Sequence, residues 1–82
     1  MKVQIITPDK AVFESDTVES IKLPGVNGEF EVLNNHAALI SALKAGKVRI
    51  KLTDKKEENF NIDSGVVEVL NNTVVVLSEA LL

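Results

Sequence analysis

Hydrophobic and polar residues alternate with a period of two along most of this chain. In the segment GKVRIKLTD, Val48, Ile50 and Leu52 alternate with basic or polar side chains. The segment ENFNID repeats the pattern with Phe60 and Ile62, and the amino-terminal KVQII begins in the same way. This period is typical of a β-strand with one buried and one exposed face. We therefore predict strands in all three segments.

Three further segments also have strand character. VVEVL and TVVVL are β-branched runs that are too short for independent helices. In SIKLP, Ile21 and Leu23 alternate, whereas Val18 is out of phase with them. This break predicts a β-bulge near Glu19 and Ser20.

Turn signals separate these runs. They fall at Thr7–Lys10, at Pro24–Gly28, where two glycines and an asparagine are suited to positive φ, at Asp54–Glu58, and at Ser64-Gly65. Short strands at regular spacing predict an all-β fold, a small antiparallel β-sandwich or flattened barrel. No linker divides the chain, so residues 1–82 form one domain.

The segment HAALISALKAG fits two structures. Leu39, Ile40 and Leu43 are compatible with one face of a helix that would end at Gly46. Leu39, Ser41 and Leu43 also fit the alternation of a strand. We favour extended structure because the flanking segments are strands.

The pentapeptide EVLNN occurs twice, at Glu31–Asn35 and at Glu68–Asn72. Each copy fits a strand end followed by a turn, since Asn tolerates left-handed φ better than other non-glycine residues. We interpret the repeat as one turn device used twice, not as a duplicated domain.

Composition excludes several classes of protein. The 82 residues contain no cysteine, which excludes disulfides and thiolate metal sites and favours a cytosolic compartment. The net charge of −3 has the wrong sign for a surface that binds nucleic acid. Aromatic residues make up only 4%, so the core must be aliphatic. No apolar run approaches the ~18–20 residues that span a bilayer, and the amino terminus is not a signal peptide.

Candidate chemistry is confined to one region. In a strand, Glu29 and Glu31 would share a face roughly 6–7 Å apart, near the single histidine, His36. An ordinary strand that places Phe30 and Val32 in the core explains the two glutamates better. His36 has no adjacent nucleophile and acid, and fits a turn residue that donates to a backbone carbonyl. We therefore predict no catalytic, cofactor-binding or metal-binding residues.

The string LPGVNGEFEVLNNHAALISALKAGKVRI resembles the signature region of the ε subunit of F-type ATP synthases. The matching residues are Gly28, Glu29, Phe30, Val32, Leu33, His36, Ala37, Leu39, Ile40, Ser41, Ala42, Leu43, Gly46, Val48, Arg49 and Ile50. Further matches extend the resemblance over nearly the full length, from Val3 to Leu77. Glu31, Ala38 and Ser64 depart from the family pattern, and both Asn-Asn pairs stand where Pro-Gly is common.

The resemblance implies a non-catalytic central-stalk (rotor) subunit of the F1Fo ATP synthase. Such a subunit packs on the γ subunit and the c-ring and couples proton translocation to ATP synthesis. It implies a peripheral location in F1, at the cytoplasmic face of the bacterial inner membrane. The expected contacts are Glu29, Glu31, Asn35, His36 and Ser41. A sandwich that binds a partner is also expected to expose an apolar face. A free-standing adaptor that binds a peptide along an edge strand is the alternative.

In this family a C-terminal helical hairpin carries inhibition of ATP hydrolysis and, in some members, an ATP site. We expect the 82-residue chain, as a short form without that hairpin, neither to bind ATP nor to inhibit through an extended arm. Isothermal titration should show no heat of binding with ATP. Micromolar affinity would contradict the expectation.

Overall fold

The computed structural model describes all 82 residues, and its regular elements are nine β-strands. The strands are β1 (Lys2–Ile6), β2 (Ala11–Ser15), β3 (Val18–Gly25), β4 (Gly28–Leu33), β5 (Leu39–Leu43), β6 (Gly46–Leu52), β7 (Glu57–Ile62), β8 (Gly65–Leu70) and β9 (Thr73–Ser78). No helix of sufficient length and apolarity to cross a membrane is present.

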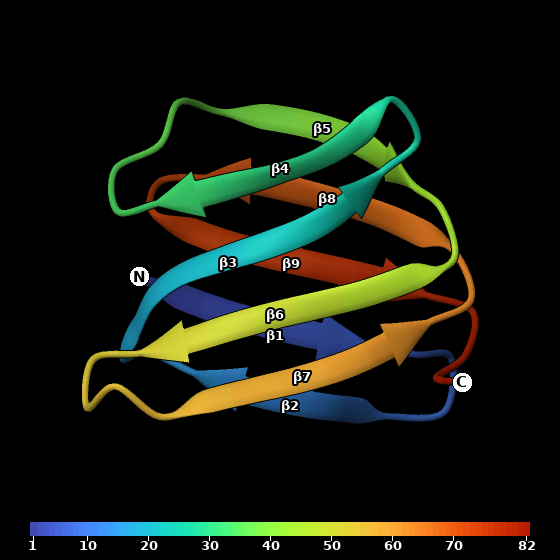
Figure 1. Cartoon of the computed structure of the whole chain (residues 1–82), viewed down its shortest axis with the longest axis horizontal. Helices are drawn as coiled ribbons and strands as arrows, with labels where there is room; N and C mark the ends of the chain where they lie inside the picture. Colours follow the sequence, from blue (N-terminus) through green and yellow to red (C-terminus); the bar gives the residue numbers. More distant parts are fainter.

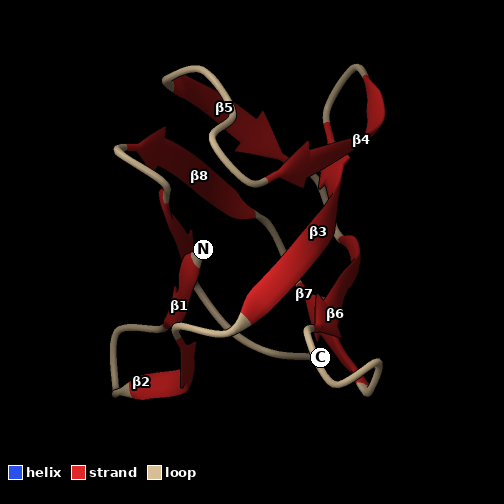
Figure 2. Ribbon diagram, turned by 90° about the vertical axis from the view of Figure 1, so that its left-hand side faces the viewer, coloured by secondary structure: helices blue, strands red, loops and turns tan.

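The strands form one continuous sheet that folds into two facing layers (Figures 1 and 2). The strand order is β2-β1-β9-β8-β5-β3-β6-β7, with β4 paired to β3 beside this path. We call β2, β1, β9, β8 and β5 the first layer, and β4, β3, β6 and β7 the second layer. The layers join where Gly25 of β3 pairs with Leu43 of β5. The predicted all-β sandwich is confirmed.

One strand pair departs from the predicted antiparallel arrangement. β1 runs parallel to β9, so that Val3 lies beside Val74 and Ile5 lies beside Val76. The first and last strands are joined by no hairpin, and their relative direction is therefore set by the rest of the sheet. All other strand pairs are antiparallel.

The core between the layers is aliphatic, as predicted. Its buried residues come from both layers: Val3, Ile5, Val18, Ile21, Leu23, Val32, Leu43, Val48, Ile50, Ile62, Val67, Val69, Val74 and Val76. Phe13 of β2 and Phe60 of β7 pack on its edge with ring centroids 5.4 Å apart. This aromatic contact covers the open side of the sandwich, where β2 and β7 are the last strands of the two layers.

The segment HAALISALKAG is extended, as favoured. In β5, Leu43 is buried, Leu39 and Ser41 are half-buried, and Ile40 is exposed, which is the expected alternation. β5 pairs with β8 along its whole length, and this pairing outweighs any local helical tendency. The predicted bulge is also confirmed, because the β3–β6 register shifts between Val18 and Ser20.

The turn predicted at Pro24–Gly28 is tighter than expected. Pro24 and Gly25 belong to β3, and Gly25 pairs with Gly28, so the turn consists of Val26 and Asn27 alone. Within this segment, positive φ occurs only at Gly28, at 127°. The expectation of positive φ at Gly25 and Asn27 was therefore wrong: Gly25 is part of the β3 ladder, and the positive φ of this turn lies at Gly28 instead.

The second EVLNN copy ends in a two-residue hairpin. Asn71 and Asn72 both have positive φ, 51° and 58°, and the flanking Leu70 and Thr73 pair with each other. Two consecutive positive φ angles are the mark of a type I′ turn, which matches the twist of a β-hairpin. Proline could not occupy the first of these positions, because its φ is fixed near −65°.

The first copy ends differently. Only Asn35 has positive φ, at 62°, and the His36 N–H donates to the Leu33 carbonyl at 3.2 Å. This is the pattern of a type II turn, in which Asn34 and Asn35 are the central residues. Each copy is a strand end followed by a turn with left-handed asparagine, as predicted, but the interpretation of the two as one turn device was wrong because the turn types differ. The two turns differ because β8 returns along β9, whereas β4 crosses to the other layer.

The two asparagine turns nevertheless contact each other. The Asn72 side-chain oxygen accepts from the Asn35 N–H at 2.8 Å, and the Asn34 side-chain oxygen accepts from the α-ammonium of Met1 at 2.8 Å. The Lys2 N–H donates to the Asn72 carbonyl at 3.1 Å. These bonds hold the β4–β5 turn, the β8–β9 turn and the amino terminus together at one end of the sandwich. We call this group the asparagine junction.

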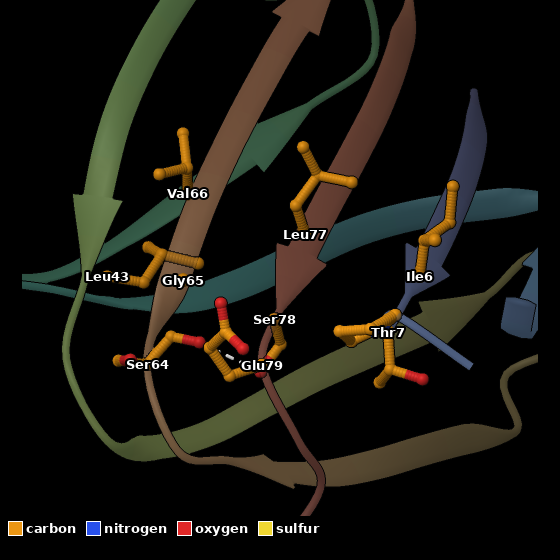
Figure 3. A pocket seen from close by; sticks show the side chains of 10 residues that line it. Ile6, Thr7, Leu43, Ser64, Gly65, Val66, Leu77, Ser78 and Glu79 are labelled. Carbon is orange, nitrogen blue, oxygen red and sulfur yellow. Dashed lines mark hydrogen bonds between the residues drawn. The ribbon is translucent and has the colours of Figure 1, made fainter. Parts of the chain in front are cut away.

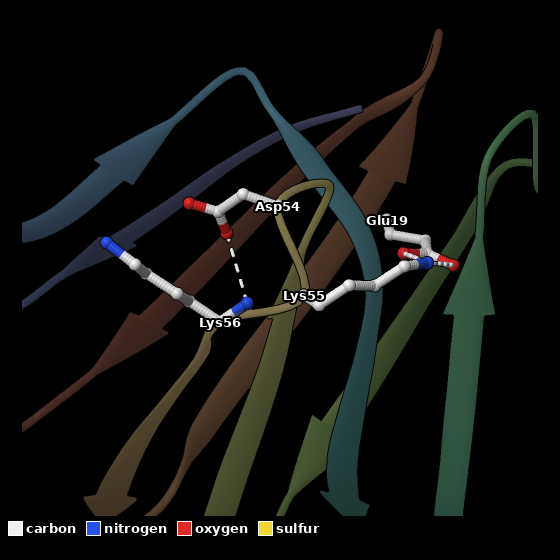
Figure 4. A network of polar contacts seen from close by, with 4 residues as sticks. All are labelled: Glu19, Asp54, Lys55 and Lys56. Carbon is white, nitrogen blue, oxygen red and sulfur yellow. Dashed lines mark hydrogen bonds and ion pairs between the residues drawn. The ribbon is translucent and has the colours of Figure 1, made fainter.

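A smaller polar contact fixes the β6–β7 hairpin (Figure 4). The Lys55 ammonium lies 3.1 Å from the carboxylate of Glu19 in the β3 bulge. Asp54 accepts from the Lys56 N–H at 3.0 Å within the turn itself. Because both partners of the ion pair are solvent-exposed, it contributes at most about 1 kcal/mol.

The asparagine junction predicts that substitutions at two neighbouring positions differ in their effect on the free energy of unfolding. Asn72→Gly retains the positive φ but removes the acceptor for the Asn35 N–H, whereas Asn71→Gly changes only a side chain without such a bond. We expect Asn72→Gly to lower the free energy of unfolding by about 1 kcal/mol more than Asn71→Gly. Urea unfolding measures this difference, and equal midpoints would show that the bond contributes nothing.

Candidate functional site

The outward side of the first layer is mostly apolar over β5, β8 and β9, and Ile6 at the end of β1 continues it. Burial of alternate residues of these strands leaves their neighbours facing outward. We define the apolar face by these outward residues: Ile6, Ile40, Ala42, Val66, Leu70, Val75 and Leu77. Ile40 is 73% exposed, and Leu70 and Leu77 are 51% and 50% exposed. These residues form one contiguous surface, unlike single hydrophobic residues scattered over a protein surface.

The strand register arranges part of this face as an unbroken strip. Ala42 pairs with Val66, Val66 pairs with Leu77, and Leu77 pairs with Ile6. Figure 3 shows the side chains of Val66, Leu77 and Ile6 on three adjacent strands. Direct cross-strand neighbours have Cβ atoms only about 4.5–5.5 Å apart. No polar side chain therefore interrupts the strip between β5 and β1.

Two shallow grooves lie along the apolar face. One, of about 620 Å³, lies where Ile6, Val66 and Leu77 meet the turn at Ser64 and the carboxylate of Glu79 (Figure 3). Gly65 lines this groove, and no larger residue fits there, since a Cβ at this position would lie 2.1 Å from the Leu77 carbonyl oxygen. The other groove, of about 370 Å³, lies between β5 and β8. Both can receive side chains from a partner surface.

The outward side of the second layer has the opposite character. Lys22 lies between Glu31 and Arg49 in the register, and Lys51 lies opposite Glu57. We call this surface the charged face. Side chains alternate in the same way along the strands of both layers. The two outward faces therefore differ only in the residue types that occupy their outward positions. The apolar face is therefore the candidate protein-docking surface.

The structure separates the predicted contact residues. Glu29 and Glu31 are exposed on β4 and point to the charged face, while Phe30 and Val32 turn inward, as expected. The carboxylates of Glu29 and Glu31 thus lie on the second layer, whereas the apolar face lies on the first.

The other three predicted residues lie near the asparagine junction or inside β5. Asn35 and His36 occupy the β4–β5 turn. The His36 Nδ1–H donates to the Ala37 carbonyl at 2.7 Å, which is the turn role expected from the sequence. Ser41 is half-buried on the inner side of β5, and its hydroxyl donates to the Ala42 carbonyl at 3.4 Å.

Sequence reasoning anticipated an exposed apolar face but missed its residues. The available signal was the run TVVVL, in which five positions include no charged residue. A strand that is apolar at consecutive positions presents apolar side chains on both faces, and one face must then meet another surface. Because Val74 and Val76 are buried in the core, the alternation of the strand places Val75 and Leu77 on the outward face.

Metal-ligating side chains form no compact group. No set of three or more His, Asp and Glu side chains is close enough to hold a metal ion. His36 and Ser41 each bond to a neighbouring carbonyl and not to one another.

Comparison with known proteins shows the family of this chain. The family model described as "ATP synthase, Delta/Epsilon chain, beta-sandwich domain" matches residues 1–82. The ATP synthase epsilon chain of Chlorobium limicola is 44% identical over 78 residues, which cover 95% of this chain and 88% of that protein. The epsilon chain of Campylobacter curvus is 43% identical over 79 residues, which cover 96% of this chain but 60% of that protein.

Two solved structures share the fold. A chain of the Tetrahymena thermophila mitochondrial ATP synthase central stalk/c-ring superposes with a TM-score of 0.86 at 23% identity, covering 100% of this chain and 65% of that one. A chain of the Euglena gracilis mitochondrial ATP synthase superposes with a TM-score of 0.91 at 18% identity, covering 98% of this chain and 51% of that one. The full-length match to the family model and the identity to epsilon chains show that this chain belongs to the delta/epsilon family of ATP synthase subunits.

Proposed function

We propose that this chain is a non-catalytic central-stalk subunit of a rotary ATP synthase. Its apolar face packs on the γ subunit, and the end of the sandwich that carries the asparagine junction approaches the c-ring. The observation that carries the proposal is the continuous apolar strip through Val66 and Leu77 in a chain of this family. The role is to transmit torque between ion flow and ATP synthesis.

The γ subunit is the partner that best suits the apolar face. A rotor subunit must stay attached under load, which requires a broad contact fixed by packing over several strands. Apolar burial contributes about 25 cal/mol per Å² of covered surface and has no strict directional requirement. The strip extends across four strands, from Ala42 to Ile6, and thus resists rotation about any one strand.

The asparagine junction is suited to a polar contact with the c-ring. Asn35 and His36 lie in the β4–β5 turn, which is held by the bond from the Asn35 N–H to the Asn72 side chain. A turn that is fixed in this way loses little conformational entropy on binding. Amide groups and the His36 ring can then bond to polar loops of the ring and set the orientation of the subunit.

The subunit takes no part in the chemical step. Its association with the membrane is peripheral, at the cytoplasmic face, and runs through the γ subunit and the c-ring. The proposed function thus assigns the whole chain to mechanical coupling.

A free-standing adaptor remains the second candidate function because of β4. This strand pairs only with β3, so its other edge is free to pair with an extended peptide. The two functions differ in the surface they use, since the free edge of β4 lies in the second layer and the apolar strip lies in the first.

The docking of γ predicts that a charge in the apolar strip blocks assembly. Leu77→Asp places a carboxylate at the centre of the strip, at a position that is half exposed and therefore tolerated in the free chain. We expect the dissociation constant for the purified γ subunit to rise at least about 100-fold, because a carboxylate is desolvated without a partner. Biolayer interferometry with immobilised γ measures this change.

Leu33→Asp is the matched control. Leu33 is 54% exposed but lies on β4 in the second layer, and its replacement should leave γ binding unchanged. Circular dichroism should show that both variants are folded. If folded Leu77→Asp bound γ as the unmodified chain does, the docking surface would have to lie elsewhere.

A further inference from the structure

β5, β8 and β9 contain one charged residue among them, Glu68. Their sequences are LISAL, GVVEVL and TVVVLS. Glu68 lies in the middle strand, between Ile40 of β5 and Val75 of β9. Along β8, its neighbours on the same face are Val66 and Leu70. The carboxylate is thus surrounded on four sides by apolar side chains, near the centre of the apolar face.

Glu68 has no cationic partner within the chain. The one ion pair of the structure joins Lys55 and Glu19. Glutamates of the charged face are placed differently, since Glu31 lies across from Lys22. In the free chain Glu68 is exposed, and water solvates its carboxylate.

Docking of a partner over the apolar face would remove this water. A carboxylate that is desolvated without a new partner weakens binding severely, and a positively charged donor in the partner offsets the loss. A partner that is apolar throughout is therefore a poor fit for this face. A partner with one basic side chain opposite Glu68 is complementary to it in both polarity and charge.

The groove beside Glu68 has the shape and lining for such a side chain. Its volume is about 370 Å³, and Glu68 is its single charged residue. Its walls are apolar: Ala38, Leu39, Ile40, Val69 and Leu70. Lysine and arginine pack their methylene groups along apolar surface and extend the charged group to a polar atom. The groove and the carboxylate together match that chemistry.

We propose that Glu68 receives a lysine or arginine side chain of the subunit that covers the apolar face, and that this contact selects the correct partner. The inference rests on the proposed function, because it requires the apolar face to be the docking surface. The basic side chain lies in the groove between β5 and β8 with its charged group on Glu68. Apolar packing through Leu77 and Val66 supplies most of the affinity, and Glu68 fixes the register of the two surfaces.

The competing role for Glu68 is protection of the free chain. A charge in the middle of an apolar face also hinders self-association. That role predicts that Glu68→Gln and Glu68→Leu aggregate more readily while their affinity for the partner is unchanged or higher. The proposed ion pair predicts weaker binding for both variants.

Binding of the purified γ subunit to Glu68→Gln tests the proposal. The amide retains the size of the side chain but removes its charge, and leaves the partner's basic group unpaired. We expect dissociation about 10- to 100-fold faster than for the unmodified chain, with little change in association rate. Glu68→Asp, which keeps the charge, should restore much of the affinity. Glu31→Gln on the charged face is the matched control and should bind normally.

Leu77→Asp, measured in the same assay, separates this inference from the proposed function. If Leu77→Asp binds weakly and Glu68→Gln binds as tightly as the unmodified chain or tighter, the ion pair is overturned and the docking face stands. If folded Leu77→Asp binds normally, the docking face fails and the inference fails with it. If Leu77→Asp and Glu68→Gln both bind weakly and Glu68→Asp recovers affinity, the docking face and the ion pair are both supported. Thermal unfolding controls for stability, since Glu68 is exposed and without internal bonds.

Discussion

The register in which β8 pairs with β5 and β9 determines both the core and the apolar face that we propose as the docking surface. Side chains alternate strictly along a strand, so the pairing that buries Val67 and Val69 must also turn Val66 and Glu68 outward. A slip by one residue would exchange the two sets and place Glu68 in the core. Burial of a carboxylate there is so unfavourable that Glu68 helps to specify the register that displays it. Stability and recognition thus depend on the same pairing.

The asparagine junction links this register to the other layer. Asn72 ends the β8–β9 hairpin and accepts from Asn35 in the turn that leads out of the second layer. The Met1 α-ammonium and Asn34 close the group from the side of β1. A displacement of β8 would therefore move the turn that carries His36. The asparagine junction thus connects the two layers at one end of the sandwich.

The sequence predicted those features that arise from local patterns. Alternation placed Val48 and Ile50 correctly because one face of their strand is polar. The alternation could not show which residues of TVVVL face the core, because both sides of that strand are apolar. Only pairing with the neighbouring strands decides this. The parallel β1–β9 pair and the contact between the two EVLNN turns depend on residues far apart in the chain, which no local pattern encodes. The family motif identified the chain, yet its residues are divided among the core, the charged face, the apolar face and one end of the sandwich.

Site-specific photo-cross-linking in the assembled synthase is the most direct test of the apolar face as the surface that meets the stalk. A benzophenone amino acid would replace Ile40, which is 73% exposed on the apolar face, or Asn59, which is exposed on β7 in the second layer. Illumination of membranes that contain each variant should join position 40 to the γ subunit and leave position 59 without a γ adduct. Cross-linking of γ from position 59, with none from position 40, would contradict the account.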